Sequence, residues 1–137
     1  MVGTARHALT ILAVNDLRRA HEFYRSVFAW DVTVDVSVYV EFALPAGQRL
    51  GVYQREAFAH TVGHPPAAPT AGHNTGVELY LYVDDVSATR ARVVPAGGQL
   101  LADAQRKPWG DEVAYVLDPD GNVLALARPL TASERVS

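Results

Sequence analysis

Carboxylates alternate with tyrosines in two short stretches of this 137-residue chain. One stretch contains Glu41, and the other, from Glu78 to Tyr82, reads Glu-Leu-Tyr-Leu-Tyr. A carboxylate that stands among tyrosines on a half-buried surface can have a raised pKa and act as a general acid or base. Both glutamates are therefore candidate catalytic groups, with Glu78 the stronger one. The competing interpretation is a solvated carboxylate or one paired with Arg49 or Arg55.

The aromatic residues around these carboxylates indicate a binding surface. Alternate side chains of a strand share one face, and here that face mixes tyrosines, charged groups and small residues. An apolar wall with a few polar groups is typical of a small-molecule pocket, whereas a solvated face enriched in strand-forming tyrosines is the alternative. The predicted ligand-binding residues are Tyr39, Tyr53, Glu78, Tyr80, Tyr82 and Trp109.

The two tryptophans have different expected roles. Trp109 lies in a Lys-Pro-Trp-Gly loop, where its indole can stack on a flat aromatic ligand or pack over the edge of its own module. Trp30 follows a predicted helix and is expected in the core. The histidines His60, His64 and His73 stand among prolines and glycines, and this spacing favours a flexible surface loop over a metal site.

Composition excludes several classes of function. The absence of cysteine rules out a disulfide framework, a thiol nucleophile and a Cys-ligated metal. A net charge of −3 without a basic stripe argues against a nucleic-acid partner. The apolar run 8–14 is too short for a signal peptide or a membrane span, so we expect a cytoplasmic protein without a membrane partner.

Hydrophobic periodicity predicts the same element order twice. The first module has a strand at 8–14, a helix at 16–28 and strands at 31–36, 38–44 and 49–55. The second has a strand at 77–83, a helix at 85–96, a strand from 100 and strands at 111–117 and 122–128. The motif Leu-x-Val-x-Asp-Leu at 12–17 recurs as Leu-x-Val-x-Asp-Val at 81–86, which favours an internal duplication.

These elements predict a single α+β domain over 1–137. It consists of a β-α-β-β-β module at 7–55, a linker at 56–75 with a short helical start at 56–60, a second β-α-β-β-β module at 76–129 and a tail at 130–137.

Several motifs resemble the vicinal oxygen chelate superfamily, which contains glyoxalases, extradiol dioxygenases, fosfomycin-resistance enzymes and bleomycin-resistance proteins. They are the repeated Leu-x-Val-x-Asp motif with Phe23-Tyr24, the strand at 50–53, Trp109-Gly110 and the Asp-Pro-Asp-Gly-Asn turn at 118–122. The similarity extends over about 7–129. It implies paired modules whose strands form a curled mixed sheet with a cleft, and a homodimer.

The resemblance also implies where a metal would bind. The superfamily's four ligand positions fall here on Leu9, Gly51, Glu78 and Ala125, and three of these cannot ligate a metal. We therefore expect no metal and no cofactor. A shifted site that uses His7 with Glu78 is the alternative.

Three hypotheses follow. The leading one is a homodimeric protein that binds and sequesters a hydrophobic, aromatic natural product such as an antibiotic, as metal-free members of the superfamily do. The second is a metal-independent isomerase, cyclase or lyase with Glu78 or Glu41 as acid or base. The third is a metalloenzyme with a rearranged site.

Overall fold

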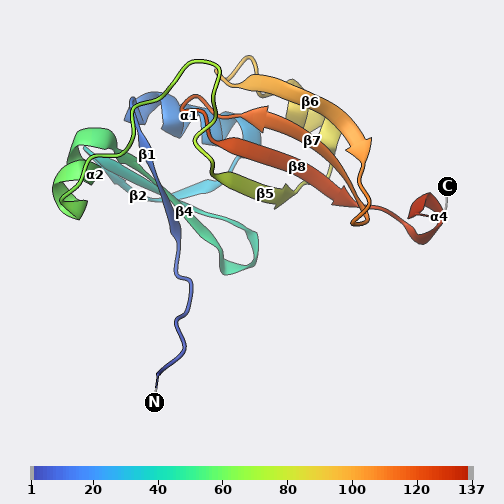
Figure 1. Cartoon of the computed structure of the whole chain (residues 1–137), viewed down its shortest axis with the longest axis horizontal. Helices are drawn as coiled ribbons and strands as arrows, with labels where there is room; N and C mark the ends of the chain where they lie inside the picture. Colours follow the sequence, from blue (N-terminus) through green and yellow to red (C-terminus); the bar gives the residue numbers. More distant parts are fainter. Residues whose placement is uncertain (1, 136–137) are drawn as a thin grey trace.

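The computed structural model describes residues 2–135 and contains two modules in tandem (Figure 1). The elements of the first module are β1 (Thr10–Val14), α1 (Leu17–Phe28), β2 (Asp31–Val36), β3 (Tyr39–Ala43), the short 3₁₀ helix η1 (Pro45–Gly47) and β4 (Arg49–Gln54). Those of the second are β5 (Glu78–Tyr82), α3 (Val86–Ala91), β6 (Gln99–Arg106), β7 (Asp111–Leu117) and β8 (Val123–Pro129). The predicted α+β fold with two β-α-β-β-β modules is confirmed.

Each module forms its own four-stranded mixed sheet. The strand orders are β1-β4-β3-β2 and β5-β8-β7-β6. In each sheet the first strand of the module lies at one edge and pairs in parallel with the module's last strand, which lies inside the sheet. Each parallel pair is completed by antiparallel neighbours on the other side of the last strand. The two sheets therefore have the same topology, as expected for a duplicated unit.

One hydrophobic core serves both modules. Helix α1 begins after Asp16, whose carboxylate accepts the N–H of Arg19 at 3.0 Å and caps the helix. Its apolar residues Phe23 and Val27 are fully buried. The same cluster contains residues of both sheets and of α3, which include Leu12, Phe42, Val52, Val86, Val116 and Leu126.

Several boundaries differ from prediction. Strand β1 begins at Thr10, which pairs with Leu50 of β4, instead of at residue 8. Helix α3 ends at Ala91 instead of 96, and turns follow it up to Gly98. The short helix predicted at 56–60 is α2, which spans Arg55–Val62, and the predicted tail contains the short helix α4 (Ala132–Arg135).

Figure 1 shows the linker after α2 passing over the molecule to reach β5, and the N-terminal segment extending away from β1. Within the described residues, no helix is long and apolar enough to cross a membrane.

Candidate functional site

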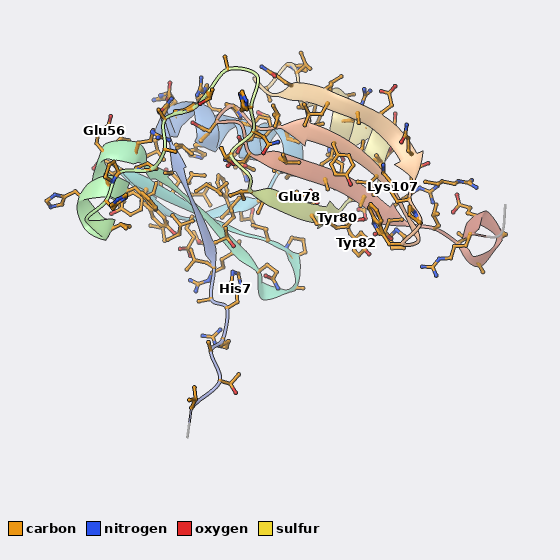
Figure 2. The ribbon with its side chains drawn as sticks, viewed as in Figure 1. His7, Glu56, Glu78, Tyr80, Tyr82 and Lys107 are labelled. Carbon is orange, nitrogen blue, oxygen red and sulfur yellow. The ribbon has the colours of Figure 1, made fainter. Side chains whose placement is uncertain are left out.

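An aromatic cluster lies on the face of the second sheet that points away from the hydrophobic core. Tyr80 and Tyr82 project from β5, side by side in Figure 2, with their ring centroids 6.0 Å apart. Trp109, in the turn between β6 and β7, donates its indole N–H to the Tyr80 hydroxyl at 2.8 Å. All three side chains remain open to solvent, with 40%, 64% and 55% of Tyr80, Tyr82 and Trp109 exposed. The cluster is therefore an ordered aromatic surface that a ligand can reach.

A buried carboxylate holds this cluster in place. Asp111, the first residue of β7, is only 5% exposed. Its Oδ2 accepts the Tyr80 hydroxyl at 2.5 Å and the Tyr82 hydroxyl at 3.2 Å. Partial burial and the hydrogen bond to Asp111 raise the pKa of Tyr80 to about 12, and the same carboxylate raises the pKa of Tyr82. Both phenols are neutral hydrogen-bond donors at physiological pH.

Small side chains form the floor beneath the aromatic rings. Across the sheet, Tyr80 stands opposite Ala125, which in turn stands opposite Tyr115. Ala125, Ala127 and Val113 are fully buried against Tyr115. These small side chains are completely covered, so a ligand at this face would meet the exposed aromatic side chains.

Glu78 and Lys107 border the floor. Glu78 is exposed at the start of β5 and makes no hydrogen bond among the described residues. The pKa of Tyr115 is raised mainly by burial and further by the negative charge of Glu78. The Lys107 ammonium lies over the Tyr115 ring, 5.6 Å from its centroid. Charged groups of both signs therefore stand at the margin of the aromatic cluster.

A second polar cluster lies on the first sheet. Glu41 is 8% exposed, accepts the Tyr39 hydroxyl at 2.6 Å and forms an ion pair with Arg49 at 3.1 Å. Burial and this hydrogen bond raise the pKa of Tyr39. Both Glu41 oxygens are engaged, so this carboxylate is tied into the sheet. The interpretation of Glu41 as an Arg49-paired residue holds.

Tyr53 is turned towards α2. Its ring packs edge-on against Tyr39, at 5.4 Å between centroids, and against Phe58 of α2, at 6.0 Å. Its hydroxyl lies 2.8 Å from the Thr61 hydroxyl. The predicted residues thus fall into two clusters, Tyr39–Glu41–Tyr53 and Tyr80–Tyr82–Trp109. Among the described residues, no hydrogen bond, ion pair or ring contact joins one cluster to the other.

The donor set does not fit a metal. Gly51 has no space for a ligating side chain, because the Tyr39 ring stands where a Cβ would lie. Within residues 2–135, no group of three or more His, Asp or Glu side chains is placed to hold a metal ion. His7 does not reach Glu78: it precedes β1, its Nε2 lies 3.1 Å from the Thr10 hydroxyl, and Figure 2 shows the two residues well apart.

Sequence reasoning missed Asp111 and Tyr115 as parts of these clusters. A signal for both was present. Asp111, Val113 and Tyr115 alternate along the predicted strand 111–117, so they share one face. Trp30 is half-buried and stacks on Phe28, with ring centroids 4.4 Å apart, so it packs against the core while keeping part of its ring exposed.

Comparisons with known proteins agree with this architecture. The family model for the glyoxalase-like domain matches residues 7–131. "Putative glyoxylase CFP32" of Mycobacterium tuberculosis is 32% identical over 120 residues, which cover 84% of this chain and 42% of that protein. The chain thus spans less than half the length of this relative.

Solved structures share the fold. A glyoxalase-related enzyme from Fulvimarina pelagi superposes with a TM-score of 0.75 at 24% identity, over 90% of this chain and 88% of that one. A glyoxalase/bleomycin resistance protein/dioxygenase family enzyme from Burkholderia phytofirmans PsJN gives 0.76 at 19% identity, over 90% and 98%. The chain belongs to the glyoxalase-like family of the vicinal oxygen chelate superfamily.

Proposed function

We propose that this protein binds a hydrophobic, planar aromatic small molecule, such as a natural-product antibiotic, and sequesters it without a metal. The observation that carries the proposal is the hydrogen-bonded array of Tyr80, Tyr82 and Trp109 around Asp111. Fixing exposed aromatic side chains before binding lowers the entropic cost of association. Their faces then stack on a flat ligand, each worth about 0.5–1.5 kcal/mol beyond area burial.

The margin of the cluster would select the ligand's substituents. Glu78 can accept from a hydroxyl or amine of the ligand, and Lys107 can donate to a carbonyl. Because Ala125 and Ala127 are fully buried, a flat ligand would rest on the exposed aromatic rings themselves. Tyr39 and Tyr53 belong to the proposal as ligand contacts from the first sheet.

Two of the structural neighbours carry bleomycin resistance in their names, and a binding role is consistent with those names. A homodimer and a cytoplasmic location are parts of the same proposal. The dimer would give a single species of twice the chain mass of 14.8 kDa by light scattering.

Fluorescence of the Trp30→Phe variant tests the binding role, since Trp109 is then the only tryptophan. We expect planar aromatic antibiotics to quench Trp109 fluorescence saturably, and doxorubicin is the first to be tested. Adding Tyr80→Ala and Tyr82→Ala should weaken the apparent Kd about tenfold or more. Quenching that never saturates, or that is unchanged by the two alanines, would contradict the proposal.

A catalytic role for Glu78 is the second candidate. It is favoured by the position of this exposed carboxylate beside Tyr115, whereas Glu41 is held by Arg49 and Tyr39. Glu78→Gln separates the two roles. A binding protein should lose only modest affinity, whereas an isomerase, cyclase or lyase that uses Glu78 as its base should lose turnover by about 10²-fold or more.

A further inference from the structure

The module boundary contains two cavities in equivalent places. Each lies between the first strand of one module and the turn that precedes the last strand of the other. The first cavity, of about 710 Å³, lies between β1 and the turn at 118–122. The second, of about 580 Å³, lies between β5 and the turn at 44–48. The duplication therefore predicts two similar crevices, and their contents differ.

The first crevice is spanned by polar contacts. Asp120 accepts the backbone N–H of Asn15 at 2.9 Å, and Arg19 donates to the Pro119 carbonyl at 3.4 Å. In the second crevice, the Arg92 guanidinium of the second module donates to the Val27 carbonyl of the first at 3.0 Å. Among the described residues, no side-chain hydrogen bond joins the turn at 44–48 to the second module. The part of the crevice beside this turn therefore has no side-chain hydrogen bond across it.

Aromatic and aliphatic side chains form the walls of the second crevice. Phe28 and Trp30 stack with 12° between their planes, and Trp30 lies nearly parallel to Tyr24, at 10° and 5.9 Å. Leu44 lies beside them, and Leu81 faces them from β5. Another flat ring can extend this series of parallel rings, and the volume falls within the range of about 300–1,000 Å³ common for small-molecule sites.

Polar groups occupy the rim. The Arg92 guanidinium is fixed by donating to the Val27 carbonyl at 3.0 Å and to the Thr89 hydroxyl at 3.3 Å. Neither contact is with a carboxylate, so N–H donors remain for a ligand carbonyl or hydroxyl. Asp84 and Asp85 also line the cavity. With two carboxylates and one guanidinium, the lining disfavours an anionic ligand.

We propose that this crevice is a second small-molecule site, which binds an uncharged planar aromatic compound between Trp30 and β5 and orients it through Arg92. It lies on the opposite side of β5 from the Tyr80–Tyr82–Trp109 cluster, and Tyr80 and Tyr82 border both regions. Its other walls come from the end of α1, the turn at 44–48 and α3, which the proposed function does not use.

Nuclear magnetic resonance separates the two sites, because each contains one of the two tryptophans. The indole N–H signals are assigned with Trp30→Phe and Trp109→Phe. The wild-type protein is then titrated with N-phenyl-1-naphthylamine, an uncharged planar probe. We expect a saturable shift of the Trp30 signal. A Trp30 signal that does not move up to the solubility limit of the probe would overturn the proposal.

A blocking variant adds a second test. Ala88 lines the crevice from an exposed position on α3, so Ala88→Phe should fill it and weaken binding, read at Trp30, about tenfold or more. Ser87→Phe, a neighbouring exposed position outside the lining, is the matched control and should bind as wild type. Equal affinity of Ala88→Phe and wild type would overturn the proposal. Shifts of Trp109 alone would support only the aromatic cluster.

Discussion

The hydroxyl of Tyr24 donates a 2.6 Å hydrogen bond to the carboxylate of Asp118, across the boundary between the two modules. Tyr24 lies on α1 of the first module, and Asp118 begins the Asp-Pro-Asp-Gly-Asn turn of the second. Both residues are buried. Asp118 also accepts the backbone N–H groups of Asp120 and Asn122, at 2.9 Å each. The turn is therefore fixed internally and bonded to the neighbouring module by the same side chain.

Removing the Tyr24 hydroxyl should destabilise the protein. Hydrogen bonds to charged groups contribute about 1.5–3 kcal/mol, so we expect Tyr24→Phe to lower the free energy of unfolding by roughly that amount in urea denaturation. Asp118→Ala should cost more, because it also removes the acceptor of the two backbone groups. A Tyr24→Phe variant as stable as wild type would show that the bond contributes nothing net.

The Asp111 carboxylate should control the ionisation of Tyr80. A negative charge beside a phenol disfavours phenolate, so removing it with Asp111→Asn should lower the pKa of Tyr80 from about 12 towards 10. Tyrosinate absorbance is followed as the pH rises, with and without the Tyr80→Phe change, in wild type and in Asp111→Asn. The difference within each pair gives the pKa of Tyr80. An unchanged pKa would mean that burial alone sets it.

Gly51 should not tolerate a side chain. A Cβ there would overlap the ring of Tyr39 and displace it from Glu41. We expect Gly51→Ala to destabilise by about 1–3 kcal/mol in urea unfolding, as overpacking does. Gly3→Ala has open space around it and serves as the control. If crowding by Tyr39 is the cause, Tyr39→Ala should reduce the cost of Gly51→Ala, and equal costs in both backgrounds would contradict it.

Helix α4 should loosen in acid. Glu134 accepts two hydrogen bonds from Arg128, at 3.0 and 2.6 Å, which lower the pKa of the carboxyl to about 2. Because the folded pKa lies below the unfolded value of about 4.3, this stabilisation is complete above that pH and disappears as the pH falls through about 2. The Tm difference between wild type and Glu134→Gln should shrink over that range, whereas a pH-independent difference would contradict the assignment. Glu22→Gln, on the exposed face of α1, is the control.

Hydrophobic periodicity was sufficient to predict the fold, because the two modules repeat the same alternation and the same capped helices. Asp16 and Asp85 cap α1 and α3. Periodicity could not predict where pairing stops. The apolar run at 8–14 begins two residues before Thr10, the first residue paired with β4. Helix α3 is followed by turns with i→i+3 hydrogen bonds before Pro95.

The candidate site was harder to predict than the fold. The tyrosines and Trp109 were predicted as candidates because they alternate or stand in a distinctive loop. Asp111 was missed because its role depends on register, since β7 and β5 meet only through β8. The separation into two clusters depends on how the sheets are placed, which no local pattern encodes.

Calorimetric titration of a planar aromatic antibiotic into wild type and Trp109→Ala tests the central claim most directly. Val94→Ala is the control, because Val94 and Trp109 are both 55% exposed and Val94 lies in the turns that follow α3, outside the aromatic cluster. If the Tyr80–Tyr82–Trp109 cluster binds the ligand, Trp109→Ala should weaken the affinity about tenfold while Val94→Ala leaves it unchanged. An identical Kd for Trp109→Ala and wild type would contradict the claim.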